Sequence, residues 1–328
     1  MATFVDLFCG GGFGARGAVR GGGVPLLGLD AWALATQTYK TNFPSSEIIT
    51  DRIENVDIDA LGERFRPDVL LTSPECTSHS IARGARPGLE TSRETAIGIV
   101  PWVRSMEPRW VIVENVSRMK KWDRHNELVQ TIEELGYTVS DLHLNSADFG
   151  SAQARKRMFL VCDSQGTTVS RDQLLGLQVN APQTANDIIE WDAGHLSTLL
   201  RKPGRAQATL ERADRAIQAL GSNVPFIIVY YSSDYAGGWQ PLTVPLRTIT
   251  TVDRFGLVTW QDGEPFLRML QPNELLKAMG GGDEHTLPHG SRREKVKLCG
   301  NGVCSDVMTA IFLWIGAVQA NDLQVQDQ

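Results

Sequence analysis

The chain has 328 residues, 42% of them hydrophobic and 21% charged, which is typical of a folded globular protein. No apolar run reaches the roughly 18 residues of a membrane-spanning helix, and the N-terminus lacks the basic start of a signal peptide, so we predict a cytoplasmic protein. The five scattered cysteines form no paired framework and no CxxC motif, which favours reduced thiols and no bound metal. The net charge of −6 argues mildly against a nucleic-acid partner, although several segments are locally basic.

The first half of the chain alternates short apolar segments with segments of helical spacing, such as Ala33–Asn42 and Asn126–Leu135. Several apolar segments are apolar at consecutive positions, as in strands that are covered on both faces. We predict strands at Thr3–Phe8, Val24–Asp30, Glu47–Asp51, Asp68–Thr72, Trp110–Glu114 and Phe159–Asp163. The alternation predicts an α/β fold with a doubly wound, Rossmann-like sheet.

This alternation stops near residue 165. Residues 164–190 are polar and rich in turns, and residues 206–220 have the pattern of an amphipathic helix that ends at Gly221. Helical patterns return at Pro272–Met279 and at Asp306–Val318. We therefore predict one large domain from residues 1–164 and 265–328, with a smaller domain, residues 165–264, inserted into it.

A glycine-rich turn follows the first predicted strand and opens a helix, an arrangement that lets backbone approach a ligand closely. Asp30 lies 20 positions after Gly10, where a carboxylate can accept hydrogen bonds from ribose hydroxyls. Nicotinamide and flavin proteins share these features. However, the glycine spacing is not a strict GxGxxG, and Asp6 before the turn would favour the cationic end of S-adenosylmethionine. Trp32 and Asp51 are candidates for the adenine face and edge, and simple helix packing is an equal alternative for Trp32.

Reactive side chains lie at or near the ends of three later strands. Cys76 comes directly after the strand that ends at Thr72, and Glu114 ends the next strand. Arg155 and Arg157 stand at alternate positions and share one face if the segment is extended. Singly, each has an ordinary explanation, namely an inert thiol, a strand end or a basic surface. Together they predict a thiol, a carboxylate and two guanidinium groups at one sheet edge.

These motifs resemble those of the DNA cytosine-5 methyltransferase family, in order and nearly from end to end. The similar segments are Asp6–Gly17 (DLFxGxGG), Pro74–Cys76 (Pro-Cys), Glu114–Val116 (ENV), Gln153–Arg157 (QxRxR), Pro245–Thr250 (the motif closing the recognition domain) and Gly300–Val303 (GN-small-V). The resemblance implies an S-adenosylmethionine-dependent methyltransferase that acts on double-stranded DNA, with residues 165–264 as its target recognition domain. It also implies a monomer without a metal, and a restriction endonuclease as a separately acting partner.

The family mechanism assigns a role to each reactive residue. Cys76 would add to carbon 6 of a flipped-out cytosine, and Glu114 would bond to N3 and the exocyclic amine. Arg155 and Arg157 would hold the base O2 or a nearby phosphate and favour the thiolate. The loop from Thr77 to about Arg93 would close over the base. The implied cofactor-binding residues are Asp6, Phe8, Gly10, Gly12, Asp30, Trp32, Asp51, Pro74, Asn301 and Val303.

The sequence departs from the family pattern beside the nucleophile, where it reads Pro-Glu-Cys-Thr instead of Pro-Pro-Cys-Gln. Glu75 adds a negative charge that disfavours a thiolate at Cys76. Glu75 therefore leaves open a catalytically impaired DNA-binding homologue. A second alternative is the same chemistry on RNA, because one branch of the family acts on transfer RNA.

Overall fold

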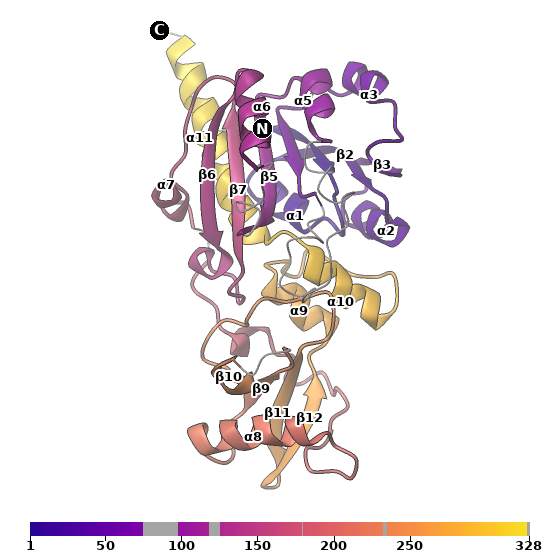
Figure 1. The fold of residues 1–328 in the computed structure, drawn as a ribbon, viewed down its shortest axis with the longest axis vertical. Helices are drawn as coiled ribbons and strands as arrows, with labels where there is room; N and C mark the ends of the chain where they lie inside the picture. The colour runs from indigo at the N-terminus through magenta and orange to yellow at the C-terminus, as the bar shows by residue number, and fades with distance from the viewer. Residues whose placement is uncertain (75–97, 118–124, 179, 232–234, 327–328) are drawn as a thin grey trace.

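The computed structural model describes residues 1–74, 98–117, 125–178, 180–231 and 235–326, which form two sheets at opposite ends of an elongated molecule (Figure 1). Within these ranges no single helix is long and apolar enough to cross a membrane. Only α10 (Arg292–Asn301) and α11 (Ser305–Gln326) together pass on length and composition, across a bend of 41°. Both helices contribute residues to the main hydrophobic core.

The strands of the larger sheet are β1 (Thr3–Leu7), β2 (Val24–Asp30), β3 (Glu47–Thr50), β4 (Val69–Thr72), β5 (Trp110–Val116), β6 (Thr138–Asn145) and β7 (Lys156–Asp163). Their spatial order is β3-β2-β1-β4-β5-β7-β6. Strands β1 to β5 are parallel, whereas β7 is antiparallel to both β5 and β6. Every predicted strand is present, and β6 is an edge strand that was not predicted. The predicted doubly wound α/β fold is therefore confirmed.

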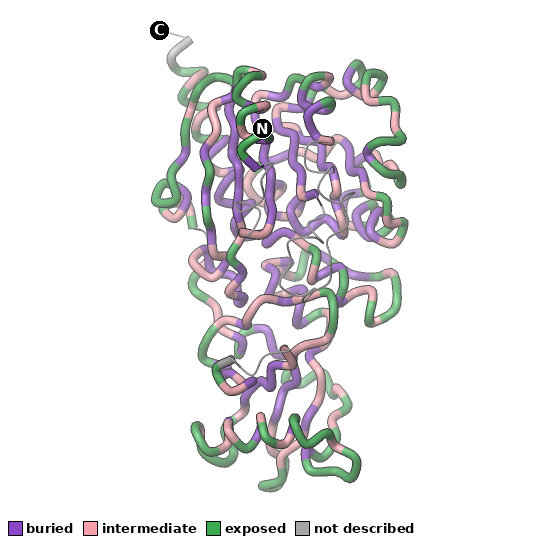
Figure 2. Tube along the Cα trace, viewed as in Figure 1, coloured by how far each residue is buried: buried purple, intermediate pink, exposed green. Residues whose placement is uncertain are grey.

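Helices cover both faces of this sheet (Figure 1). Besides α11 they are α1 (Phe13–Arg20), α2 (Ala33–Asn42), α3 (Ile58–Arg64), α5 (Val100–Met106) and α6 (His125–Glu134). Phe4 and Leu71 join the cluster that contains residues of α1 and α11, whereas Val5 and Leu70 join the cluster that contains residues of α5 and α6. The central strands are therefore buried on both faces, as the purple tube of Figure 2 shows, and this explains their consecutive apolar residues.

Helix α1 packs directly against α11, which comes from the other end of the chain. A Cβ atom at Gly17 would lie 2.1 Å from the backbone oxygen of Ser305. The Ser305 hydroxyl donates a hydrogen bond to the Phe13 carbonyl (2.8 Å), and the Thr309 hydroxyl donates one to the Gly17 carbonyl (3.1 Å). Glycine at position 17 is thus what allows the two helix backbones to come this close.

Replacing Gly17 by alanine is expected to lower the free energy of unfolding by about 2 kcal/mol, because the added methyl group forces α1 and α11 apart. Urea denaturation measures the change. Gly316→Ala in α11 is the matched control, since a Cβ there meets nothing within 4 Å. Alanine is the better helix former, so this control should gain up to about 1 kcal/mol. Equal effects of the two substitutions would contradict the packing argument.

The smaller sheet consists of β8 (Thr198–Leu199), β9 (Phe226–Val229), β10 (Trp239–Pro241), β11 (Phe255–Gln261) and β12 (Glu264–Met269). These strands are antiparallel, in the order β10-β9-β11-β12-β8. Helix α8 (Gln207–Leu220) buries Ala213 and Ala216 in one cluster with Phe226 and Ile228. The amphipathic helix predicted over residues 206–220 is therefore confirmed.

The smaller sheet does not coincide with the inserted domain expected from the sequence. Strand β12 ends at Met269, past residue 264, and Pro245–Thr250 lies between β10 and β11. Near its start, α7 (Arg171–Leu175) and the 3-10 helix η4 (Ala185–Ile188) place buried residues in the main core. Polar, turn-rich segments carry no periodicity, so these contacts could not be predicted.

The remaining elements are the 3-10 helices η3 (Ser146–Phe149) and η5 (Tyr235–Gly238) and helix α9 (Pro272–Ala278). Helices α9 and α10 lie between the two sheets (Figure 1). The prediction of a helix at Pro272–Met279 is therefore confirmed, and the helix predicted at Asp306–Val318 is the first part of α11.

Candidate active site

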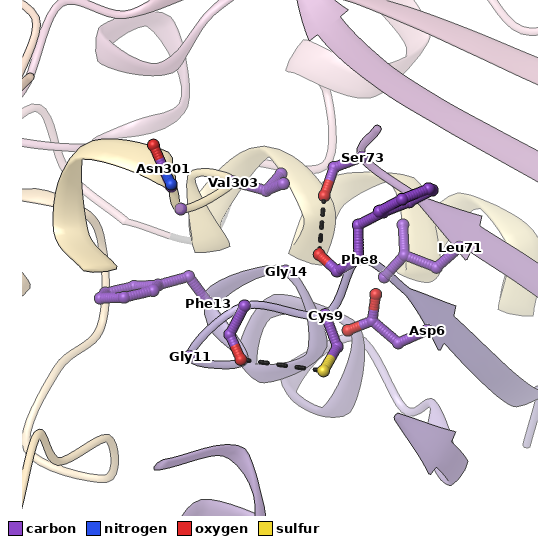
Figure 3. Close-up of a pocket in the computed structure, with 12 residues that line it drawn as sticks. Asp6, Phe8, Cys9, Gly11, Phe13, Gly14, Leu71, Ser73, Asn301 and Val303 are labelled. Carbon is purple, nitrogen blue, oxygen red and sulfur yellow. Dashed lines mark hydrogen bonds between the residues drawn. The ribbon is translucent and has the colours of Figure 1, made fainter. Parts of the chain in front are cut away.

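The strand order of the larger sheet reverses beside β1, because the chain runs from β1 outwards to β2 and β3 and then returns to β4 on the other side. Ligands bind at such a switch point, at the carboxyl ends of the strands. A cavity of about 300 Å³, open space at its mouth included, lies at this point (Figure 3). Its lining residues are Asp6, Phe8, Cys9, Gly10, Gly11, Phe13, Gly14, Leu71, Ser73, Asn301, Gly302 and Val303.

The glycine turn that lines this cavity has an unusual backbone. Phe8 has a φ of 58°, a left-handed conformation that is costly for a residue other than glycine. The Ser73 hydroxyl donates a hydrogen bond to the Phe8 carbonyl (3.3 Å; Figure 3). The Asp30 carboxylate accepts hydrogen bonds from the backbone N–H groups of Gly10 (2.9 Å) and Trp32 (2.8 Å). Side chains from β2 and from the end of β4 thus hold the turn in place.

Asp6 is a buried carboxylate that faces the cavity (Figure 3). No residue in the described part of the chain donates a hydrogen bond to it. Burial raises the pKa of Asp6 well above its ordinary value, and the nearby Asp30 carboxylate raises it further. A buried negative charge without a partner is unfavourable, and a cationic ligand group in the cavity would relieve this cost. The Asp6 carboxylate therefore fits the ammonium or sulfonium end of S-adenosylmethionine.

Residues from the two ends of the chain meet at this cavity. Of the candidates for cofactor binding, the lining includes Asp6, Phe8, Gly10, Asn301 and Val303. The other candidates, which do not line it, are Gly12, Asp30, Trp32, Asp51 and Pro74. The structure thus brings half of the candidates together around one space.

Two of the residues outside the lining have other contacts. The Lys297 ammonium lies 4.3 Å from the centroid of the Trp32 ring. Asp51 is exposed, and its carboxylate accepts a hydrogen bond from the Asn55 amide (2.8 Å). Neither the cation over Trp32 nor the exposure of Asp51 could be read from the sequence.

Sequence reasoning also missed several lining residues. Leu71 and Ser73 stand at the carboxyl end of β4, a position that would have marked them as candidates. Phe13 forms another part of the wall, and the His285 ring packs on it with ring centroids 4.8 Å apart. Burial lowers the pKa of His285 to about 3, so this ring is neutral and acts as packing. Nothing in the sequence connects residue 285 with the turn.

An ion pair between the buried Glu114 and the partly buried Arg157 lies at the end of β5. The Arg157 Nε atom, on the neighbouring β7, is 3.2 Å from Glu114 Oε1. Burial raises the pKa of Glu114, and the positive charges of Arg157 and Arg155 oppose this shift. Glu114 is therefore easier to protonate than an exposed glutamate, and a protonated carboxyl can donate a hydrogen bond as well as accept one.

Arg155 makes different contacts from Arg157. Its guanidinium group is buried and donates hydrogen bonds to the carbonyls of Ile249 (3.0 Å) and Gly300 (2.9 Å). Burial lowers the pKa of Arg155 to about 10. It therefore ties the segment between β10 and β11 to the end of α10. Of the two predicted arginines, only Arg157 pairs with Glu114.

The ENV motif also contacts the start of the predicted nucleophile loop. The Asn115 amide donates a hydrogen bond to the Pro74 carbonyl (3.2 Å). Cys76 itself lies outside the described residues, as do Glu75, Thr77 and the loop to about Arg93. Over the residues that are described, no group of three or more His, Cys, Asp or Glu side chains is arranged to hold a metal ion.

Several known proteins are similar to this chain in sequence. The type II methyltransferase M.HhaI of Haemophilus parahaemolyticus is 26% identical over 329 residues, covering 96% of this chain and 94% of the relative. M1.HphI of the same species is 28% identical and covers 51% of this chain and 47% of the relative. The human tRNA (cytosine(38)-C(5))-methyltransferase is 27% identical and covers 49% and 42%. The chain thus matches only about half the length of several curated relatives.

Solved structures share the fold. A prophage-encoded candidate DNA modification methyltransferase from E. coli has a TM-score of 0.73 at 14% identity, covering 98% of this chain and all of the other. Spodoptera frugiperda DNMT2 has a TM-score of 0.69 at 15% identity, covering 96% of this chain. The sequence model described as C-5 cytosine-specific DNA methylase matches residues 2–317. The chain therefore belongs to the C-5 cytosine-specific DNA methylase family.

Proposed function

We propose that the protein transfers a methyl group from S-adenosylmethionine to carbon 5 of cytosine in a short DNA sequence. The observation that carries this proposal is the ion pair of the buried Glu114 with the partly buried Arg157, which stands at the strand ends of the same sheet edge as the cavity beside the glycine turn. A buried carboxylate beside a guanidinium group offers a hydrogen-bonding edge to a polar heterocycle.

The residues around the cavity would hold the cofactor, which supplies an electrophilic methyl group. Asp6 would face its cationic end, while Phe8, Gly10, Asn301 and Val303 form the surrounding walls. Of the remaining candidates, we assign Gly12, Asp30 and Pro74 to shaping the turn and loop, and Trp32 and Asp51 to the adenine face and edge.

In the proposed reaction, the Cys76 thiolate adds to carbon 6 of the cytosine, and the electron pair moves to carbon 5. Glu114 bonds to N3 and the exocyclic amine and stabilises the charge that builds up on the ring. Carbon 5 then accepts the methyl group, and loss of its proton expels the thiolate. Arg157 holds Glu114 and the O2 side of the base, whereas Arg155 acts as a positioning residue through its backbone contacts.

Asn115 has a positioning role in this scheme. Its hydrogen bond to the Pro74 carbonyl fixes the chain two residues before Cys76. The strand that carries Glu114 therefore also sets where the nucleophile loop begins. This coupling is useful because a misplacement of about 1 Å between reacting groups can cost two orders of magnitude in rate.

Duplex DNA is the substrate that we favour over RNA. The relative matched over 94% of its own length is a type II methyltransferase, and the family is described as acting on DNA. A cytosine inside a duplex is inaccessible, so it would be flipped out, at a cost of a few kcal/mol. The lobe around the smaller sheet would recognise the sequence. We further propose a monomer whose restriction endonuclease acts separately.

Incubation with labelled S-adenosylmethionine, duplex DNA and transfer RNA in separate reactions tests the proposal. We expect label in DNA, recovered as 5-methylcytosine. Label in transfer RNA alone would mean that the substrate is transfer RNA and not DNA. Tight cofactor binding without label in any nucleic acid would identify a catalytically impaired homologue.

Replacing Asp6 by asparagine is expected to weaken cofactor binding by about 10- to 100-fold, because a charge-assisted contact is worth roughly 1.5–3 kcal/mol. Since the pKa of Asp6 is raised, binding by the unaltered protein should weaken as the pH falls through that pKa, and the variant should lack this dependence. Isothermal titration calorimetry measures both effects. Asp262→Asn, in an exposed turn of the smaller sheet, is the matched control.

The same substitution has an opposite effect on stability. A carboxyl whose pKa is raised by folding stabilises the folded state below its unfolded pKa, and this contribution is lost as the pH rises. At pH 7 the ligand-free Asp6→Asn protein should therefore melt at a higher temperature than the unaltered protein. A lower melting temperature would mean that the Asp6 carboxylate has a structural partner.

A further inference from the structure

Ser73 lies between the glycine turn and the start of the proposed nucleophile loop. It is the first residue after β4, and Phe8 is the first residue after β1. The last residues of these two strands, Thr72 and Leu7, are paired in the sheet. The Ser73 N–H donates a hydrogen bond to the Leu7 carbonyl (3.4 Å), and its hydroxyl donates one to the Phe8 carbonyl (3.3 Å; Figure 3). Ser73 thus continues the contact between β1 and β4 beyond the ends of both strands.

The hydroxyl group of Ser73 holds a strained part of the turn. Phe8 has a φ of 58°, and a left-handed backbone is unfavourable for a residue that has a Cβ atom. Such a conformation persists only where the surrounding contacts fix it. The Ser73 hydroxyl supplies one of these contacts, and Phe8 lines the cavity that we assign to the cofactor. Loss of the hydroxyl should therefore loosen one wall of this cavity.

The chain is also held directly after Ser73. Pro74 is buried and its ring fixes φ, and a residue that precedes a proline is restricted to extended conformations. The Asn115 amide donates a hydrogen bond to the Pro74 carbonyl (3.2 Å), and Asn115 directly follows Glu114 in β5. Ser73 and Pro74 therefore form a short, stiff segment that is bonded to the cofactor turn at one end and to β5 at the other. Cys76 follows this segment after one further residue.

We propose that Ser73 is a positioning residue for methyl transfer, which couples the shape of the cofactor cavity to the placement of Cys76. The inference rests on the proposed function. The Ser73 hydroxyl holds the Phe8 carbonyl on the cofactor side, and the backbone of Ser73 and Pro74 leads to the nucleophile. One side chain therefore affects two steps, the binding of S-adenosylmethionine and the addition of the thiolate to the base. A hydroxyl that only touched the cofactor would affect the first step alone.

Replacing Ser73 by alanine should weaken the binding of S-adenosylmethionine about fivefold, the usual net effect of one hydrogen bond, as isothermal titration calorimetry measures. At saturating cofactor, the single-turnover rate of methylation of duplex DNA should also fall, by about tenfold, because a shift on the order of 1 Å between reacting groups costs up to about 100-fold. Ser73→Thr keeps the hydroxyl and should keep both properties. Asn115→Ala should lower only the rate, since its hydrogen bond reaches the loop and not the turn.

Ser105→Ala is the matched control. The Ser105 hydroxyl is also half-buried and donates to a backbone carbonyl, that of Ile58 (3.1 Å), but neither residue lines the cavity. This protein should lose a similar amount of thermal stability and keep the affinity and the rate of the unaltered protein. If Ser73→Ala changed only one of the two properties or neither, or if Ser73→Thr behaved like Ser73→Ala, the inference alone would be overturned, because the unaltered protein would still methylate DNA. Absence of methylation by the unaltered protein would overturn the proposed function, and the inference with it.

Discussion

Replacing Cys76 by serine is expected to reduce methyl transfer to DNA by a factor on the order of 10⁴ or more, while cofactor binding is unchanged. A serine hydroxyl is ionised far less than a thiol at neutral pH and is a poorer nucleophile towards carbon 6. The ring then never gains the electron density that carbon 5 needs. Labelled S-adenosylmethionine measures the rate, and calorimetry measures the binding.

A trapping experiment separates loss of the nucleophile from general damage. In DNA with 5-fluorocytosine at the target, carbon 5 has no proton to lose, so the adduct with Cys76 should persist and survive denaturing electrophoresis. The Cys76→Ser protein should form none. Cys162→Ala is the control, because burial in β7 raises the pKa of the Cys162 thiol and keeps it unreactive. An adduct in the Cys76→Ser protein would disprove the assignment.

Replacing Glu114 by glutamine is expected to lower the methylation rate by about 10²–10³, the usual cost of removing a group that stabilises charge in a transition state. Glutamine keeps the size of the side chain, but it can neither give up a proton nor take on the negative charge that pairs with Arg157. Since Glu114 touches the base and not the cofactor in this scheme, the affinity for S-adenosylmethionine should not change.

Glu133→Gln, at an exposed position of α6, provides the matched control and should behave like the unaltered protein. A second comparison uses Arg157→Lys, which keeps a positive charge beside Glu114 but loses the planar guanidinium group. If Glu114→Gln methylated DNA within threefold of the normal rate, Glu114 would be a structural residue only.

Most of the larger sheet could be predicted, because its central strands are buried on both faces and read as apolar runs. Strand β6 was not predicted because it lies at the edge of the sheet and its residues alternate between buried and exposed. Ser140, Leu142 and Leu144 are buried, whereas Asp141 and His143 are exposed. This short alternation lacks the apolar run that identified the other strands. The end of the smaller sheet was missed because the short strand β12 pairs with the adjacent β11 and with the distant β8. The segment before β11 was missed because it pairs with the distant Gln153.

The sequence identified some residues of the candidate site but not the contacts that they make. Motifs identified Asp6 and Glu114 because their chemistry and their position at strand ends agree with each other. The different contacts of Arg155 and Arg157 could not be predicted, since the Arg155 contacts depend on the backbone carbonyls of residues 249 and 300. For the same reason, nothing in the sequence indicated that Lys297 lies over Trp32.

The contact between α1 and α11 has a consequence for how the enzyme is made. The cavity beside the glycine turn takes Asp6 from the first strand and Val303 from the chain just before α11. A ribosome must therefore have produced residue 303 before this cavity has its second wall. Contacts between residues this far apart also form slowly. A nascent chain that ends before Asn301 should thus lack this wall and hold a ligand in the cavity only weakly.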